Sequence, residues 1–176
     1  PYWEDLRFPS QGINPPGTAT DPSVDQSTGL YLFEAAKESL LAGVAQMPHA
    51  MLDYSPLRPH IHVHASPDED PALGGVAIWT LEWKWYNVGD PVPAEYTSDS
   101  KTHTMSSLVG GRPVHDVLAF DEVPAVGKRD SSIFQWRISR KGDEAGDTYG
   151  ESITLIEFDL HYQVGWPPGS VEEYPS

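Results

Sequence analysis

The chain has 176 residues, and 26 acidic against 11 basic side chains give it a formal net charge of -15 at pH 7. That length suits one domain with its own core, while the charge argues against a nucleic-acid partner and an anionic membrane surface, because both attract cationic proteins. The absence of cysteine excludes a disulfide scaffold, a thiolate zinc site and a cysteine nucleophile. With 17 prolines and aromatic side chains at 11%, the composition predicts a folded, turn-rich, all-β domain.

The first 29 residues divide into a short apolar segment and a loop. Residues 9–29 contain four prolines and three glycines, and proline removes backbone donors and restricts the residue before it, which favours an extended loop. We therefore expect residues 1–29 to form an extended N-terminal arm and a Pro/Gly-rich loop. Its large apolar side chains should pack on the same domain or form an interface with a neighbour. These are Tyr2, Trp3, Leu6 and Phe8.

Residues 30–176 are expected to form a single β-sandwich domain. Short apolar runs are separated by proline and glycine, which is typical of a sandwich or barrel. Residues 34–45 also have some helical character, but Gly43 and the β-branched Val44 weaken it. About eight strands are expected, which suits a jelly-roll-like β-sandwich with the N-terminal arm. They are the runs 30–35, 40–47, 60–65, 76–86, 101–108, 114–120, 132–140 and 152–164.

Three of these runs carry large apolar side chains at every second position, which places them on one face of a strand. The residues between them are mostly polar, as expected for strands with one buried and one solvated side. We interpret these stripes as core and not as a cofactor site, and we prefer the same interpretation over a carbohydrate-binding platform for the tryptophans. The stripes are Trp79, Leu81, Trp83 and Trp85; Phe134, Trp136 and Ile138; and Ile156, Phe158, Leu160, Tyr162 and Val164.

The most specific chemical motif is a set of histidines at every second position. His60, His62 and His64 share one face of a predicted strand, and adjacent imidazoles on one face can converge on a metal ion. The H-x-H spacing is similar to that of cupins, in which a glutamate soon follows and a further histidine lies on a later strand. Here Glu69 lies in an acidic, Pro-flanked loop and is a poor mimic, whereas His161 could serve as the later histidine. The alternative is a metal-free, hydrogen-bonded sheet face or a pH-dependent subunit interface.

Other candidate sites have weaker patterns. Glu157 and Asp159 share a strand face, as a glycosidase pair would, although paired acids in so acidic a chain are more often solvated. Asp143, Glu144 and Asp147 have the composition of a cation loop but not the spacing of an EF-hand, so a plain acidic turn is the preferred interpretation. The motifs of serine hydrolases, P-loops, dinucleotide-binding folds and zinc proteases are absent. We expect no catalytic residues and no enzymatic activity.

Seven short stretches are spread over most of the chain: WEDLRFP (3–9), INPPG (13–17), VAQMPH (44–49), RPHIH (58–62), LEWKW (81–85), DTYG (147–150) and EFDLHYQ (157–163). Together they resemble a largely uncharacterised family of small virion proteins of tailed bacteriophages. His64 stands where relatives tend to carry an aromatic residue, whereas His60, His62 and His161 match the family pattern. The metal-ligand set that we expect, if the cluster binds a divalent metal, is therefore His60, His62 and His161.

The resemblance implies a structural role in the phage particle. Its best-fitting form is a capsid decoration (cement) protein, a jelly-roll homotrimer that binds the major capsid protein on the outer surface of the head. The alternatives are a tail, adaptor or fibre component and a cupin-like metalloenzyme. No charged leader and no run of 18 apolar residues is present, so we expect neither a signal peptide nor a membrane-spanning segment, and synthesis in the host cytoplasm.

Overall fold

The alternating runs of the sequence form strands in the structure, a computed structural model that describes residues 1–66 and 75–165. Each of the eight expected runs overlaps a strand, although the strand Thr97–Thr104 covers only the first half of the run 101–108. No helix in these two ranges is long or apolar enough to cross a membrane. In chain order the elements are β1 (Tyr2–Pro9), the short 3-10 helix η1 (Ser10–Gly12), β2 (Ser23–Val24), β3 (Tyr31–Phe33), β4 (Glu38–Gln46), β5 (Arg58–Ala65), β6 (Val76–Tyr86), β7 (Thr97–Thr104), β8 (Asp116–Ala119), β9 (Ile133–Lys141) and β10 (Ile153–Val164).

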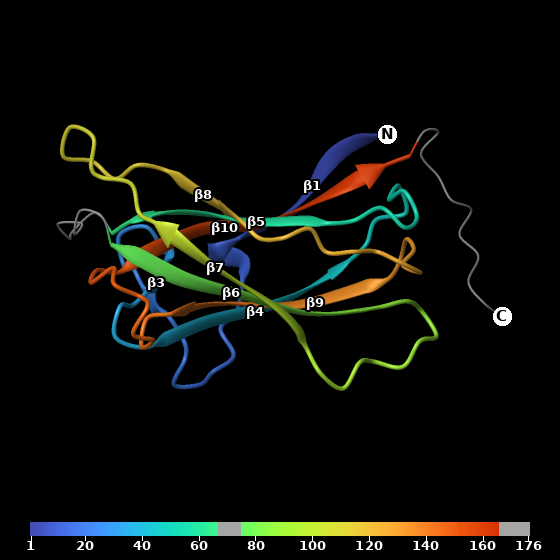
Figure 1. The fold of residues 1–176 in the computed structure, drawn as a ribbon, viewed down its shortest axis with the longest axis horizontal. Coiled ribbons are helices and arrows are strands. Elements are labelled where there is room, and N and C mark those ends of the chain that lie inside the picture. Colours follow the sequence, from blue (N-terminus) through green and yellow to red (C-terminus); the bar gives the residue numbers. More distant parts are fainter. Residues whose placement is uncertain (67–74, 166–176) are drawn as a thin grey trace.

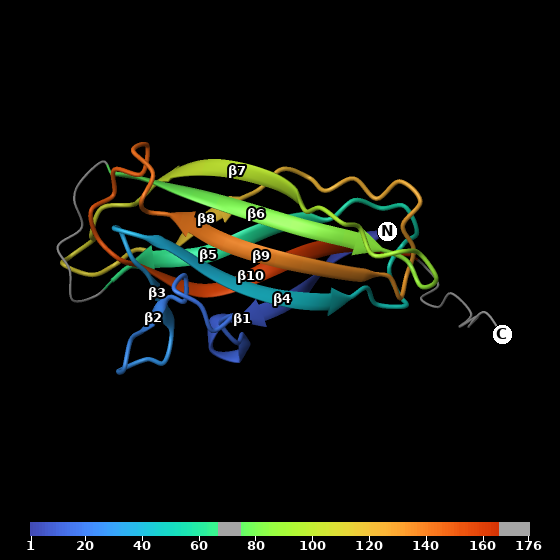
Figure 2. The ribbon, with the colours of Figure 1, turned by 90° about the horizontal axis from the view of Figure 1, so that it is seen from below.

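The strands form two antiparallel sheets that face each other, as Figure 1 and Figure 2 show from two directions. One sheet has the order β2-β3-β10-β5-β8, with β1 also paired to β10, and the other has the order β4-β9-β6-β7. Without β1 and β2, the two orders β3-β10-β5-β8 and β4-β9-β6-β7 are those of a jelly roll, built from two Greek keys. The predicted jelly-roll-like sandwich is therefore confirmed.

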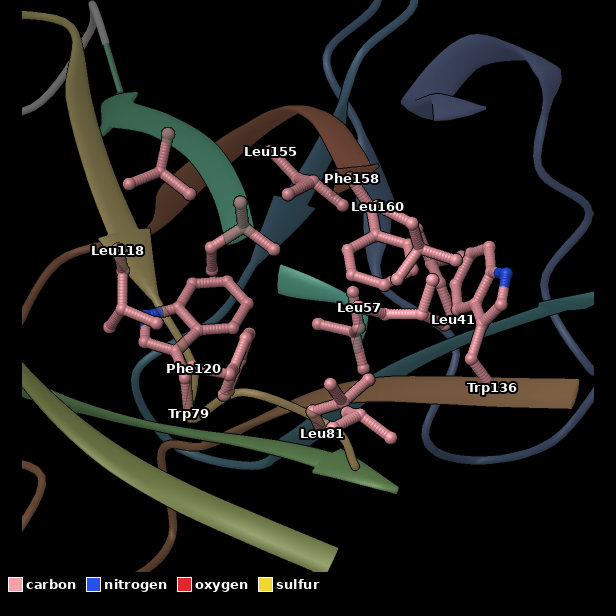
Figure 3. Close-up of a cluster of buried hydrophobic side chains, with 14 of the residues drawn as sticks. Leu41, Leu57, Trp79, Leu81, Leu118, Phe120, Trp136, Leu155, Phe158 and Leu160 are labelled. Carbon is pink, nitrogen blue, oxygen red and sulfur yellow. The ribbon is translucent and has the colours of Figure 1, made fainter. Parts of the chain in front are cut away.

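The core lies between the sheets and is rich in aromatic rings. In Figure 3, Trp136 of β9 lies beside Phe158 of β10, and their ring centroids are 4.7 Å apart. Trp79 is fully buried and its ring centroid is 4.9 Å from that of Phe33. Trp79 and Trp85 are thus core residues, as predicted, and they are not available as a platform for a sugar. Trp83 is partly buried and packs against the same core.

The segment with some helical character is a strand, and one glycine in it has a packing role. Gly43 lies in β4 opposite Trp136 in β9. A Cβ atom at position 43 would lie 2.3 Å from Cζ2 of the Trp136 indole, which is far inside van der Waals contact. The glycine that weakens the helical pattern therefore makes room for a large core ring on the neighbouring strand.

The N-terminal residues differ from the expected arm. Tyr2–Pro9 is a strand of the six-stranded sheet, paired with β10 along its whole length, from Tyr2 opposite Val164 to Pro9 opposite Glu157. Residues 1–29 thus contribute two strands to the sandwich, because β1 covers what would otherwise be an open edge of β10. The boundary expected at residue 29 does not separate two structural units.

The four N-terminal apolar side chains divide between the two faces of β1. Leu6 and Phe8 pack against the core of their own domain, and the Phe8 ring is 5.3 Å from the ring of Trp136. The half-buried Trp3 lies on the opposite face, where the Arg58 guanidinium stands 4.2 Å from its ring centroid. Tyr2 is 49% exposed. The cluster predicted as an interface is therefore largely used within the domain, and Tyr2 and Trp3 are the members that remain at the surface.

Strand β10 contains a β-bulge that determines which of its residues face outward. Leu155 is opposite Val63, whereas Glu157, two residues later, is opposite His62, the very next position on β5. Ile156 is therefore an extra residue in the strand. Before the bulge the odd-numbered Leu155 faces the core, and after it the odd-numbered positions, beginning with Glu157, face outward.

Candidate functional site

The histidine motif lies on the outer face of the six-stranded sheet. Ile61 and Val63 point into the core with no exposed surface, so the histidines between and beside them point outward. On the adjacent β10, Asp159 is opposite His60 and Glu157 is opposite His62. The two central strands of this sheet thus bring the H-x-H pair next to the outward-facing acids of β10.

Three side-chain atoms of this face converge on one point. His60 Nε2 and His62 Nε2 are 3.0 Å apart. Asp159 Oδ2 is 3.5 Å from His60 Nε2 and 3.3 Å from His62 Nε2. These residues, the His60/His62/Asp159 cluster, form a group whose donor atoms could hold a metal ion.

The other side of each imidazole is held by a neighbour. His62 Nδ1 is 2.7 Å from Nε2 of His115, which lies just before β8. The His60 ring packs edge-on against the ring of His161. Both rings are therefore oriented with Nε2 toward Asp159. His115 did not appear in the sequence-based site, and the signal available was its place at the start of the predicted strand 114–120.

His161 and His64 take different positions from the expected ligand set. The His161 ring stands edge-on to His60, with centroids 4.4 Å apart, but its Nε2 faces Asp5 Oδ1 at 3.0 Å. His64 Nδ1 lies 2.6 Å from the Ala65 carbonyl oxygen. Of the set predicted from sequence, the structure brings His60 and His62 together, with Asp159 in the place expected for His161.

Burial is the main cause of the shifted pKa values in the cluster. It raises the pKa of Asp159 to about 7, with the negative charges of Glu157 and Asp5 adding to the effect. Burial also lowers the pKa of His60 and His62, and neighbouring histidines lower them further. The Asp159 side chain is 5% exposed, and its Oδ1 has no hydrogen-bond partner among the described residues.

In each of the two acidic groups considered in the sequence, one carboxylate already forms an ion pair with an arginine. Arg7 Nη2 donates hydrogen bonds to both carboxylate oxygens of Glu157, at 2.9 and 2.8 Å, so Glu157 is not free to act with Asp159 as a glycosidase pair. The Asp147 carboxylate forms a buried ion pair with Arg140. Asp147 is therefore part of the structural core and not of a cation loop.

An open groove of about 440 Å³ runs beside the His60/His62/Asp159 cluster, between β5 and the residues around β8. It gives solvent access to the edge of the cluster. The groove is lined by Arg58, Pro59, His60, Val117, Ala119, Phe120, Asp121, Glu122 and His161.

A second candidate surface lies at one end of the sandwich, where the loops after β4, β6 and β8 meet (Figure 1). Asn87 Nδ2 donates a hydrogen bond to the Gly127 carbonyl at 2.9 Å, and the Tyr54 amide donates one to the Lys128 carbonyl at 3.0 Å. We call this surface the loop end, comprising residues 47–57, 87–96 and 121–131. Its exposed apolar side chains are Leu52 (38% exposed), Tyr54 (55%), Val88 (59%), Val92 (56%) and Val126 (89%).

No protein-family model and no curated protein sequence matches this chain. The CBM36-1 domain of a multidomain xylanase from the hindgut metagenome of Trinervitermes trinervoides aligns over 92% of this chain and 99% of that domain, with a TM-score of 0.47 and 8% identity. Dimeric latent PorU from Porphyromonas gingivalis aligns over 93% of this chain and 13% of its own, with a TM-score of 0.43 and 13% identity. The arabinose-bound α-L-arabinofuranosidase MgGH51 aligns over 90% of this chain and 22% of its own, with a TM-score of 0.33 and 12% identity. At these values the likenesses do not bear on function.

Proposed function

We propose that this chain is a structural protein of a tailed-phage particle, a decoration protein that binds the major capsid protein on the outer surface of the head and stabilises the shell. The sequence motifs that resemble phage virion proteins support this proposal, as does the jelly-roll fold. The charge of -15 suits a surface that faces away from packaged DNA. In this proposal the protein is made in the host cytoplasm and assembles on the head as a homotrimer.

The observation that carries the proposal is the loop end. A chain with a net charge of -15 exposes five large apolar side chains there, on three neighbouring loops. Apolar groups that gather on a polar protein mark sites of association, because burying them releases about 25 cal/mol for each Å² removed from water. The partner in this proposal is the capsid shell.

The loop end is also ordered in advance of binding. Asn87 connects two of its loops, since its side chain donates to the Gly127 carbonyl and accepts from the Arg129 amide at 3.2 Å. Tyr54 has a φ of 62°, a left-handed conformation that costs energy for a tyrosine and that its loop nevertheless maintains. A preformed surface loses less conformational entropy on binding, which favours a firm attachment.

Binding to shells tests the proposal. The chain would be co-expressed with the major capsid protein encoded in the same phage genome, and the purified shells would be imaged and their bound copies counted. We expect density for one jelly roll per chain outside the shell. Val126→Asp should reduce occupancy at least tenfold, because it places a charge in the buried contact.

The matched control is Val109→Asp. Val109 is 71% exposed and lies in the loop between β7 and β8, at the opposite end of the sandwich (Figure 1), so this variant should bind shells as the wild type does. Absence of the wild-type protein from shells, or equal loss with both variants, would overturn the proposal. Density on the tail of the complete phage would replace it with a tail or adaptor role.

A further inference from the structure

We propose that His60, His62 and Asp159 together bind one divalent transition-metal ion, with zinc the best match, on the outer face of the six-stranded sheet. The proposal goes beyond the role on the capsid and does not depend on it. It differs from the ligand set expected from sequence, because a carboxylate of β10 takes the place of a histidine.

The spacing of the donor atoms carries the proposal. Zinc bonds of about 2.0–2.1 Å at tetrahedral angles place neighbouring ligand atoms about 3.3 Å apart. The three distances within the His60/His62/Asp159 cluster are 3.0, 3.3 and 3.5 Å. The donors thus already form one face of a tetrahedron of the size that zinc requires.

Asp159 gives an independent observation. Its side chain is 95% buried, with 5% exposed, and its Oδ1 atom has no hydrogen-bond partner in the described part of the chain. Arg7 lies opposite Asp159 in the pairing of β1 with β10, but its guanidinium donates its hydrogen bonds to Glu157. A buried carboxylate without such partners is costly, and a cation held between Asp159 and the two imidazoles would remove that cost.

His62 is oriented as metal ligands usually are. A ligating imidazole commonly uses its second nitrogen in a hydrogen bond that fixes its tautomer and its orientation. His62 does so through Nδ1 with Nε2 of His115. With a proton on His62 Nδ1, its Nε2 carries the lone pair that a metal needs.

The ligand types favour zinc or a similar ion over calcium or magnesium. Two imidazole nitrogens and one carboxylate oxygen are typical of zinc, whereas calcium and magnesium prefer oxygen ligands alone. Three protein ligands leave a fourth position, and the open groove beside His60 allows water to reach it. Such an ion would connect β5 and β10, the two central strands of this sheet.

The test is zinc binding by the full chain, purified without a histidine tag and freed of metal by chelation. We expect one zinc per chain by elemental analysis and by calorimetric titration. Asp159→Asn and His62→Ala should each weaken zinc binding by about 100-fold or more, since each removes a ligand. His115→Ala should weaken it by about 10- to 100-fold, because it only orients His62.

His64→Ala is the matched control, as His64 lies on the same strand and face but outside the cluster. It should bind zinc as the wild type does. Zinc should also raise the thermal midpoint of the wild type and of His64→Ala, but not that of Asp159→Asn, whose fold is checked by circular dichroism. Absence of zinc binding by the wild type, or wild-type zinc affinity in Asp159→Asn, would overturn the proposal. Loss of zinc binding in His161→Ala but not in the variants of the cluster would also overturn it. None of these outcomes alters the expected effect of Val126→Asp on shells, so the two proposals can fail separately.

Discussion

Arg140 connects β9 with β3 and with the loop that precedes β10. Its side chain is fully buried in β9 and forms a two-bond ion pair with Asp147, with Nε to Oδ2 at 3.0 Å and Nη2 to Oδ1 at 2.7 Å. It also donates to the carbonyls of Phe33, Tyr149 and Glu151. A buried charge is tolerated only when its donors are satisfied, and here the guanidinium closes the turn that precedes β10.

Replacing Arg140 should therefore be costly. Arg140→Met leaves the Asp147 carboxylate buried without its partner, and we expect a loss of about 3–5 kcal/mol in the free energy of unfolding. Arg137→Met, on the same strand, changes the net charge equally but breaks a partly exposed pair with Glu82, which should cost about 1 kcal/mol or less. Urea unfolding of both variants measures the difference, and equal losses would contradict the assigned role.

Asp159 should make the stability of the metal-free protein depend on pH. Its folded-state pKa of about 7 lies above its ordinary value, so the folded state holds a proton that the unfolded state releases. This contribution is fully present below about pH 4 and is lost as the pH rises through 7. His60 and His62 act in the opposite direction, since their lowered pKa values favour folding as the pH rises toward 6.5.

Comparison of Asp159→Asn with the wild type separates the contribution of Asp159 to pH-dependent stability from that of the histidines. With chelator present, the two should have similar stability near about pH 4, and the variant should be more stable by at least about 1 kcal/mol near about pH 8. Asp143→Asn, which changes an exposed acid in a turn, should give a difference that does not vary with pH. Urea unfolding at a series of pH values measures both, and a gain that shrinks as the pH rises would contradict the raised pKa.

At the scale of elements, β1 is the strand whose role differs most from its appearance in the sequence. It ends in proline, carries the charged residues Glu4, Asp5 and Arg7, and has no β-branched residue, which is unusual for a strand. Its inward positions nevertheless carry Leu6 and Phe8, and the Phe8 ring contacts both Trp136 and Phe158. The strand therefore contributes to the core as well as covering the edge of β10.

Two aromatic substitutions separate the faces of β1. Phe8→Ala should lower the free energy of unfolding by about 2–3 kcal/mol, somewhat less than for a fully buried ring, because Phe8 is half-buried. Trp3→Ala removes an outward ring that contacts Arg58 and should cost about 1 kcal/mol or less. Thermal unfolding measures both, and a larger loss for Trp3→Ala would mean that the inward and outward faces of β1 are assigned wrongly.

The alternation of apolar and polar side chains was sufficient to predict the main strands. The runs that contain Trp79, Trp136 and Phe158 each have an apolar residue at every second position. The pairing of β1 with β10 could not be predicted, since it joins the two ends of the described chain. The same limit applies to the site. The period of two placed His60 and His62 on one face, but which acid lies opposite depends on the register between strands.

At the scale of the whole molecule, the net charge and the exposed apolar side chains have opposite effects on association. The net charge of -15 makes copies of the chain repel one another, while the loop end exposes Leu52, Tyr54, Val88, Val92 and Val126. Charge repulsion weakens with salt and apolar contact does not. Attachment through the loop end would therefore become easier as repulsion between neighbouring copies is screened.

The excess of acidic residues should also affect folding stability. Raising the salt from about 10 to about 200 mM should increase the thermal midpoint at neutral pH, because screening relieves repulsion in the compact state. Near pH 4.6, the isoelectric point of the sequence, the increase should disappear. Scanning calorimetry at the two pH values measures this, and an equal increase at both would indicate a salt effect unrelated to net charge.

The bulge at Ile156 shifts the register of β10 by one residue. One additional residue changes the phase of everything after it, and so Asp159 faces outward while Phe158 faces the core. Removing that residue would leave each later side chain chemically intact but place it on the wrong side of the sheet. Over 153–164, therefore, a deletion or insertion should cost more than an exchange of residue type at any one outward-facing position.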